Sequence, residues 1–173
     1  MVISLTGFMG VGKSTIAAAL SRHLYCKHLD LDIYIEELNN GKTIDELFEI
    51  MGEDKFRETE EEALKKLLSE NKEKVLVLSL GGGTLISDKN REIILNRTKC
   101  IYLKANLETL NKRLEKSRKQ RPLVKNEEVE SLKERITNLY KEREVGYNYC
   151  SSVTIEIDNL SLKEVLIKIL TAI

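Results

Sequence analysis

The sequence predicts an α/β fold, in which a mostly parallel sheet is covered by helices on both faces. Short apolar runs typical of buried strands alternate along the chain with longer segments of helical spacing, and such alternation is characteristic of parallel sheets. The length of 173 residues indicates one domain with one hydrophobic core. We found no internal repeat and no low-complexity segment in the sequence.

Five apolar runs have the length and composition of buried strands. The first of them ends at a glycine, the third is the most apolar and stops at three consecutive glycines, and the last alternates apolar with polar residues. The predicted strands are residues 2–6, 27–31, 75–80, 100–104 and 153–157.

Apolar spacing and capping residues predict the helices. Thr43 with Glu46, and Ser161 with Glu164, form capping boxes that mark two helix starts. The segment 115–125 is dense in lysine and arginine and contains the single proline, so we predict a loop there. The predicted helices are residues 14–25, 32–38, 43–51, 53–70, 88–95, 107–114, 127–143 and 161–170.

Composition and charge argue against several classes of protein. Lysine plus arginine and aspartate plus glutamate both number 28, so the net charge gives no support for a nucleic-acid or membrane-surface partner. No apolar run approaches the ~18 residues that a membrane span needs, and no signal peptide is visible. The three cysteines form no Cys-x-x-Cys pair, so we expect reduced thiols in a cytoplasmic protein and no zinc site.

The most specific motif follows the first predicted strand. Residues 7–14 fit the phosphate-binding pattern G-x-x-x-x-G-K-[ST]. Glycines let successive backbone amides face one anion, and the following helix adds the positive end of its dipole. Lys13 would then reach the β- and γ-phosphates, and Ser14 would ligate Mg²⁺. The residues expected to contact a nucleoside triphosphate are Gly10, Val11, Gly12, Lys13, Ser14 and Thr15.

The phosphate motif alone does not distinguish a small-molecule kinase from a GTPase or an ATP-driven machine. The chain has no room for a second, motor-type domain, and the Asn-Lys-x-Asp motif of GTPases is absent. Asp30 and Asp32 follow the second strand, at the sheet edge where ligands bind, although either could simply cap a helix. Arg57 and Glu60 could form a surface ion pair, and the glycines 81–83 either admit a ligand close to the backbone or form a plain turn.

Together these motifs resemble those of the shikimate kinases over nearly the whole chain. The resemblance implies a P-loop NTPase fold of the nucleoside-monophosphate-kinase type, with a five-stranded parallel sheet in the order 2-3-1-4-5. It also implies transfer of the ATP γ-phosphoryl group to the 3-hydroxyl of shikimate, a step towards chorismate and the aromatic amino acids. The matching residues are 7–15, Asp30, Asp32, Ile35, Glu36, Ile44, Phe48, Gly52, Glu53, Phe56, Arg57, Glu60, Gly81, Gly82, Gly83, Arg121, Pro122, Leu123, Arg143 and Tyr147.

For the acceptor, the resemblance implies a binding site that includes the glycine triplet 81–83, whose amides would contact the ring hydroxyls. Asp32 would hold the shikimate hydroxyls and orient or deprotonate the nucleophile. Arg57 and Arg143 would bind the carboxylate, because a guanidinium binds a planar carboxylate through two parallel hydrogen bonds. Glu60 would hold these arginines in place.

For the donor, the resemblance implies a lid at residues 112–125. The lid and a substrate-binding subregion at residues 32–61 would belong to a single kinase domain, residues 1–173. Arg113 would stack on the adenine, and Arg121 would close over ATP as a catalytic residue together with Lys13 and Asp32. Asp30 would join Ser14 near Mg²⁺.

Two alternatives stay open. Another small-metabolite kinase of the same fold, for gluconate or a nucleotide, would also use two arginines, since Arg57 and Arg143 could bind a phosphate. A non-catalytic ATP-binding module would not need Asp32 and Arg121. The chain departs from the shikimate kinase pattern at Val145, at Ser151-Ser152 and at Leu80, where many members have Thr or Ser, which leaves Ser79 as the polar contact near the metal. We expect a monomer.

Overall fold

The computed structural model describes residues 1–71, 75–119 and 129–173. Within them, five parallel strands form one sheet in the order β2-β3-β1-β4-β5. The predicted fold class and strand order are therefore confirmed. The strands are β1 (Val2–Thr6), β2 (Lys27–Asp30), β3 (Leu76–Ser79), β4 (Lys99–Lys104) and β5 (Val153–Glu156).

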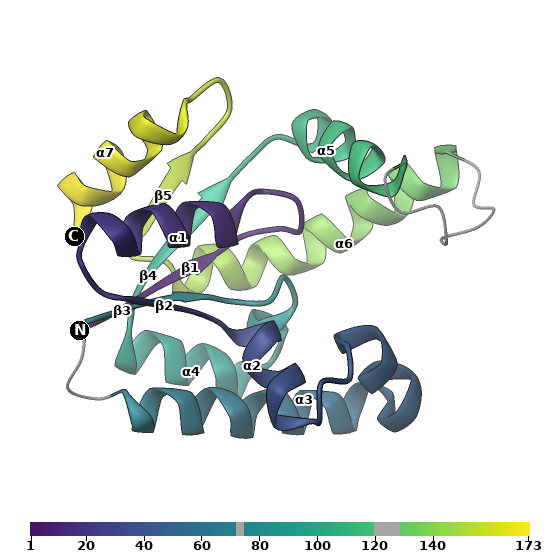
Figure 1. Ribbon diagram of the computed structural model, residues 1–173. Coiled ribbons are helices and arrows are strands. Elements are labelled where there is room, and N and C mark those ends of the chain that lie inside the picture. The colour runs from purple at the N-terminus through teal and green to yellow at the C-terminus, as the bar shows by residue number, and fades with distance from the viewer. Residues whose placement is uncertain (72–74, 120–128) are drawn as a thin grey trace.

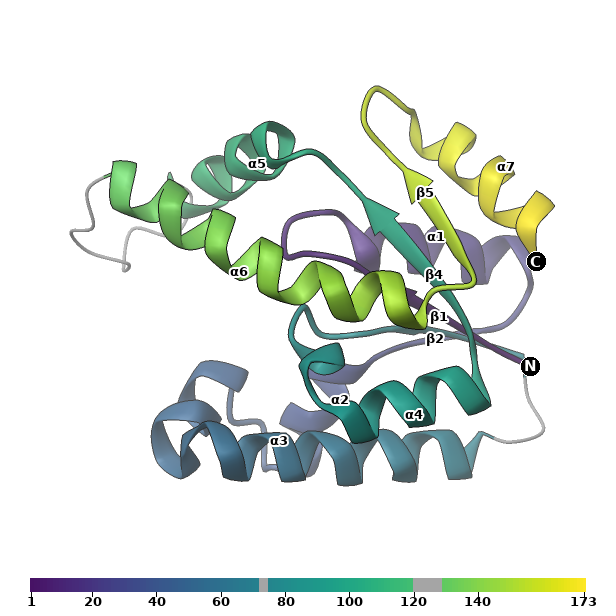
Figure 2. The same cartoon turned by 180° about the vertical axis from the view of Figure 1, so that it is seen from behind.

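Helices cover both faces of this sheet. Figure 1 shows α1 (Lys13–His23) and α7 (Leu162–Ala172) over one face, and the view from behind in Figure 2 shows α4 (Asp88–Arg97) and α6 (Val129–Cys150) over the other. The long helix α3 (Ile44–Glu70) runs beside α4. The other elements are α2 (Leu31–Leu38), the short 3-10 helix η1 (Thr84–Ile86) and α5 (Leu107–Lys119).

The core lies on both faces of the three central strands. Ile3, Leu5, Val77, Leu78 and Ile101 are completely buried. A strand with helices on both sides buries both of its faces, which explains why these strands are continuous apolar runs in the sequence. All five strands end at the same edge of the sheet, so their following loops gather there.

A break at Gly52 divides α3 as the sequence predicts. Gly52 has φ 74° and ψ 171°, a backbone conformation that residues with a Cβ rarely adopt. The capping box of Thr43 and Glu46 is present at the start of the helix. The turn brings the ring of Phe48 onto that of Phe56, with centroids 4.1 Å apart.

Two helices extend further than the sequence predicts. Residues 115–119 continue α5, so the predicted loop is wrong there. Glutamate, lysine and arginine, which make up most of this stretch, all have a good helix propensity. Helix α6 continues beyond Arg143 because Tyr147 and Cys150 are buried against the rest of the fold. Residues 120–125 of the predicted loop lie outside the described residues.

Three further observations concern the described residues alone. None of their helices combines the length and the low charge that a membrane span needs. All three cysteines carry free thiols. No group of three or more His, Cys, Asp or Glu side chains in this part of the chain could by itself enclose a metal ion.

Candidate active site

The loop between β1 and α1 has the backbone that the phosphate motif requires. Gly7, Gly10 and Gly12 have φ values of 145°, 79° and 102°, in the region that favours glycine. A Cβ at Gly7 would also lie only 2.5 Å from the Leu103 carbonyl oxygen. Helix α1 begins directly at Lys13, so its N-terminal amides and the positive end of its dipole face the loop.

Lys13 folds back over this loop. Its Nζ donates hydrogen bonds to the carbonyl oxygens of Gly7 at 2.7 Å and Phe8 at 3.2 Å. Burial lowers the pKa of Lys13 to about 8, while the carboxylates of Asp32 and Asp30 act in the opposite direction. An anionic phosphate beside this ammonium would favour its charged form.

Ser14 and Asp30, the two residues expected to hold Mg²⁺, lie together. Ser14 Oγ donates to Asp30 Oδ2 at 2.8 Å. The other oxygen of Asp30 accepts from the backbone N–H of Asp32 at 3.1 Å and caps α2. The capping role and the functional role of Asp30 are thus compatible. A hydroxyl and a carboxylate are oxygen ligands of the kind that Mg²⁺ prefers, and two of them suffice when phosphates and waters complete the octahedron.

Asp32 lies between the phosphate loop and the glycine triplet. Burial raises the pKa of Asp32 to about 6, with further contributions from the carboxylates of Asp30 and Glu60, whereas Lys13 lowers it. A carboxyl group with such a pKa is ionised at neutral pH and basic enough to accept a proton from a hydroxyl group.

The three glycines 81–83 face three different functional side chains. A Cβ on Gly81 would lie 2.5 Å from Asp32 Oδ1, one on Gly82 3.5 Å from an Arg143 nitrogen, and one on Gly83 2.9 Å from an Arg57 nitrogen. One carboxylate and two guanidinium groups therefore converge on a stretch of backbone without side chains. This arrangement leaves the amides of the triplet accessible at close range.

Arg57 is held in a defined orientation by its neighbours. Its Nη1 donates to Glu60 Oε2 at 2.9 Å and to the Gly83 carbonyl at 3.3 Å. The guanidinium lies 5.5 Å from the ring centroids of both Phe48 and Phe56, at a distance where cation–π attraction operates. The Nε of Arg57 is buried and makes no hydrogen bond within the described structure.

Glu60 supports Arg57 from the protein interior. One of its oxygens binds Arg57, and the other accepts from the Thr84 hydroxyl at 2.7 Å. The family resemblance implies that Glu60 holds both arginines; the described contacts of Glu60 are with Arg57 and Thr84. Arg143 lies over the ring of Phe8, 5.9 Å from its centroid. The roles of Phe8 and Thr84 were missed, because they depend on contacts between segments that are distant in the sequence.

Helix α6 positions Arg143 against the triplet. One turn after Arg143, the Tyr147 hydroxyl donates to the Gly82 carbonyl oxygen. A Cβ at Gly146 would collide with the Leu85 carbonyl, so the helix packs on η1 at a distance that only glycine permits. The Nε of Arg143 is buried and, like that of Arg57, makes no hydrogen bond to the described residues.

A mostly apolar cavity of about 240 Å³ adjoins the phosphate loop at Gly12. Arg113, the residue predicted to stack on the adenine, lines this cavity and donates to the Val11 carbonyl oxygen at 2.9 Å. Asp158 follows β5, where the resemblance to the shikimate kinases also implies a contact with the base, and its Oδ2 accepts from the backbone N–H of Asn106 at 2.8 Å. The lining residues are Val11, Gly12, Thr15, Ile16, Arg113, Ile157, Leu160, Leu162 and Val165.

Arg121, one of the predicted catalytic residues, lies outside the described residues, as do all of residues 120–125 of the predicted lid 112–125. The described site thus contains the phosphate loop, the Ser14–Asp30 pair, Asp32, the glycine triplet and two arginines. These groups can bind a phosphorylated nucleotide beside a small hydroxylated carboxylate.

Comparisons with known proteins find similar proteins over nearly the whole chain. A family model described as shikimate kinase matches residues 9–173. The shikimate kinase of Enterococcus faecalis is 40% identical over 169 residues, 97% of this chain and 95% of that protein. The shikimate kinase of Dictyoglomus turgidum is 36% identical over 170 residues, 97% of this chain and 94% of that protein.

Solved structures extend the similarity to the fold. The crystal structure of shikimate kinase from Bacteroides thetaiotaomicron matches with a TM-score of 0.89 at 30% identity, over 99% of this chain and 97% of that chain. Shikimate kinase from Acinetobacter baumannii in complex with shikimate matches with a TM-score of 0.84 at 34% identity, over 98% and 90%. The chain therefore belongs to the shikimate kinase family, whose members use ATP.

Proposed function

We propose that this kinase transfers the γ-phosphoryl group of MgATP to the 3-hydroxyl of shikimate, with Asp32 as the residue that activates the hydroxyl. The observation that carries the proposal is the glycine triplet, which faces Asp32, Arg143 and Arg57 in turn. A hydroxylated ring with one carboxylate matches this set of one carboxylate, two guanidinium groups and backbone without side chains. The relative from Acinetobacter baumannii that was solved with shikimate supports the same substrate.

The two arginines would bind the substrate carboxylate. Arg57 comes from α3 and Arg143 comes from α6. The Nε atom of each is buried and makes no hydrogen bond within the described structure. A planar carboxylate can accept from each guanidinium through short, charge-assisted hydrogen bonds. Glu60 keeps Arg57 aimed at the triplet, because their ion pair is largely excluded from water.

Asp32 would accept the proton of the attacking hydroxyl. The hydroxyl oxygen forms the new bond to the γ-phosphorus, the bond from that phosphorus to the bridging oxygen breaks, and ADP leaves. Lys13 lies beside Asp32 and is held by the phosphate loop, so it would neutralise charge on the transferred group. Positioning and charge neutralisation account for most of the catalysis in phosphoryl transfer.

Ser14 and Asp30 would hold the Mg²⁺ of MgATP. When bound, the ion would offset the negative charge that develops on the transferred group. The cavity beside Gly12 would receive the base, next to Arg113. Thr15 and the amides of Gly10, Val11 and Gly12 would bind the phosphates.

The domain organisation is part of the same proposal. Residues 32–61 contain Asp32, Arg57 and Glu60 and would act as the substrate-binding subregion, with Gly52 as its internal break. Residues 112–125 would form the lid that brings Arg121 over ATP and excludes water. We also propose that the enzyme is cytoplasmic and monomeric. Sedimentation of the purified protein would test its oligomeric state.

The decisive experiment measures ADP release with each candidate acceptor. Shikimate should give rapid, MgATP-dependent turnover, and the product should be phosphorylated at the 3-hydroxyl by NMR. Gluconate and nucleoside monophosphates should not exceed the background. Turnover with a nucleotide but none with shikimate would overturn the proposal, and ATP binding without turnover on any acceptor would favour a non-catalytic module.

A further inference from the structure

The two arginines of the candidate acceptor site are held in different ways. Arg57 donates to Glu60 and to the Gly83 carbonyl oxygen. The Arg143 side chain makes no ion pair and donates no hydrogen bond to the residues that the structure describes. Its guanidinium lies over the ring of Phe8, 5.9 Å from the centroid. The direction of the Arg143 guanidinium therefore depends on its contact with this ring.

Phe8 belongs to the phosphate loop, yet its side chain points into the protein. The residue is 1% exposed, and its ring meets that of Tyr140 in an edge-to-face contact with the centroids 5.5 Å apart. The carbonyl oxygen of Phe8 accepts a hydrogen bond from Lys13 Nζ at 3.2 Å. One residue thus connects the loop that would bind phosphate with the arginine that would bind the acceptor.

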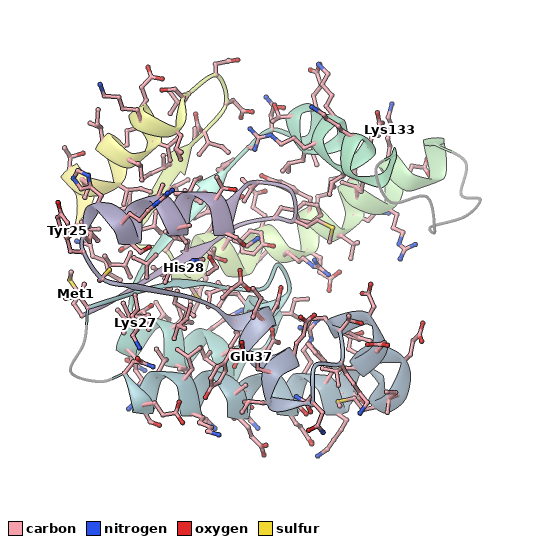
Figure 3. The ribbon with its side chains drawn as sticks, in the orientation of Figure 1. Met1, Tyr25, Lys27, His28, Glu37 and Lys133 are labelled. Atoms are coloured by element: carbon pink, nitrogen blue, oxygen red, sulfur yellow. The ribbon has the colours of Figure 1, made fainter. Side chains whose placement is uncertain are left out.

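Both contacts of the Phe8 ring come from α6. Tyr140 and Arg143 are three residues apart, so they lie on one face of the helix. This face meets the loop between β1 and α1, beside which α6 passes in Figure 1. Figure 3 labels Lys133 of the same helix, two turns before Tyr140 and away from the loop. Phe8 therefore contacts an aromatic ring and a guanidinium within a single turn of α6.

A group of polar side chains between α6 and β4 holds the Tyr140 ring. The Tyr140 hydroxyl donates to Glu144 Oε1 at 3.1 Å and lies 3.1 Å from the Tyr102 hydroxyl. Lys104 Nζ binds the same oxygen of Glu144 at 2.9 Å. Both tyrosines are buried, and satisfied polar networks of this kind make a core rigid. Tyr140 therefore offers Phe8 a fixed surface.

We propose that Phe8 is a positioning residue for the acceptor: its ring, held by Tyr140, sets the direction in which the Arg143 guanidinium faces the glycine triplet. The inference rests on the proposed function, since it takes Arg143 to bind the substrate carboxylate. Phe8 acts through Arg143 and does not itself contact the acceptor. Cation–π attraction needs no anionic partner, so the ring orients Arg143 without supplying a carboxylate that would compete with the substrate.

The protein without ligands provides the first test. The order parameter of the Arg143 Nε–Hε bond is measured by ¹⁵N relaxation, and its resonance is assigned from its loss in Arg143→Gln. In the wild type the value should approach the ~0.85 that is typical of a rigid backbone. Phe8→Leu keeps an apolar side chain but removes the ring, and it should lower the value below about 0.6. The order parameter of Arg57 Nε–Hε should not change, because Glu60 still binds Arg57.

Two variants of α6 complete the relaxation measurement. Tyr140→Phe keeps the ring but loses its hydroxyl, so the Arg143 order parameter should fall part of the way. This variant decides the question if Phe8→Leu does not fold. Tyr149→Leu is the matched control, because it removes an exposed tyrosine ring from the same helix and should leave the Arg143 order parameter unchanged.

Shikimate binding then shows whether the effect reaches the acceptor. In NMR titrations, Phe8→Leu should bind shikimate about tenfold more weakly than the wild type, because binding must then order a long side chain that was already ordered. Its affinity for ATP should change less than about twofold. In an Arg143→Gln background, Phe8→Leu should have almost no further effect, since residues that act as one unit are not additive. In an Arg57→Lys background it should keep its full effect.

Three results would overturn the proposal. The first is an unchanged Arg143 order parameter in Phe8→Leu, or in Tyr140→Phe if Phe8→Leu does not fold. The second is equal loosening of Arg57, which would indicate a general loss of packing. The third is a full tenfold effect of Phe8→Leu in the Arg143→Gln background. The relaxation measurement needs no shikimate, so it stays decisive even if the wild type does not bind shikimate, a result that would instead overturn the proposed function.

Discussion

Asp32 lies directly against Gly81, at a position where a single added carbon atom on the glycine would come within 2.5 Å of its Oδ1. The same carbon would lie 3.0 Å from the Thr84 hydroxyl oxygen. A separation of 2.5 Å is shorter than real Cβ atoms show, so the carboxylate of Asp32 or the backbone would have to move. The position of the proposed base is thus set by the absence of a side chain at Gly81.

The substitution Gly81→Ala should therefore displace Asp32 and lower kcat by about 100-fold, since a displacement of ~1 Å of a catalytic group has this order of effect. ATP binding, measured by calorimetry, should be nearly unchanged. Gly82→Ala is the comparison, because its new methyl group would make only ordinary contacts at 3.5 Å. It should leave the pH dependence of the rate unchanged, whereas a normal kcat in Gly81→Ala would contradict the assigned geometry.

The rate should depend on pH through the ionisation of Asp32. Burial raises the pKa of Asp32 to about 6, and the proposed base must be ionised, so kcat/KM should fall as the pH decreases through about 6. Asp32→Asn should remove this dependence and lower kcat by about 10²- to 10⁴-fold, with ATP binding largely intact. Near-normal turnover in this variant would refute the proposed role of Asp32.

The same variant should be more stable than the wild type at neutral pH. A carboxyl group whose pKa is raised on folding favours the folded state only when protonated, so its contribution is full below pH 3.8 and is lost as the pH rises to about 6. Replacing Asp32 by a neutral amide should raise the free energy of unfolding at pH 7.5 by up to about 3 kcal/mol. Urea denaturation should show the gain shrinking towards pH 4; a destabilised variant at pH 7.5 would indicate a structural role instead.

Arg57→Lys should weaken the binding of shikimate without affecting ATP. Lysine keeps a charge near Glu60 but lacks the planar fork that binds a carboxylate, so the KM for shikimate should rise about 10- to 100-fold. Arg57→Ala should do the same and also lower the melting temperature, because it leaves the buried Glu60 without its ionic partner. Lys55→Ala, exposed on the same helix, is the control. Equal weakening of both substrates would count against the carboxylate clamp.

Arg113→Ala should weaken the binding of ATP without affecting that of shikimate. Arg113 lines the cavity beside Gly12 and binds the Val11 carbonyl, so its loss should raise the KM for ATP by about tenfold through lost stacking and hydrogen bonding. The KM for shikimate should not change. Lys112→Ala removes a neighbouring but exposed charge of α5 and should have no effect; a matching effect would show that charge alone matters.

Local sequence patterns were sufficient to predict the elements around the phosphate loop. The first strand, the loop and the start of α1 were predictable because an apolar run, glycines at fixed spacing and an amphipathic segment occupy consecutive residues. Both predicted capping boxes, at Thr43 and Ser161, are present because a cap involves residues only three apart. The boundary after Arg143 failed for the opposite reason, since burial of Tyr147 against distant segments prolongs α6.

The candidate site depends partly on local sequence patterns and partly on contacts between distant segments. Asp30 and Asp32 follow a strand, so their place at the sheet edge could be predicted from the alternation of elements alone. The sequence did not reveal that Asp32 touches Gly81, that Thr84 shares Glu60 with Arg57, or that Phe8 lies under Arg143. Each of these contacts joins segments that are more than twenty residues apart.

By itself, the sequence determined that this chain is an α/β protein with a triphosphate-binding loop, because both features rest on short-range periodicity and spacing. Only the tertiary structure decided which side chains meet at the acceptor site. The strand order inserts β3 between β2 and β1, and this sets the glycine triplet and Ser79 beside the aspartates of β2 and the start of α2. Long-range packing of strands and helices determines which side chains lie together there, because these residues are distant in the sequence and no local pattern links them.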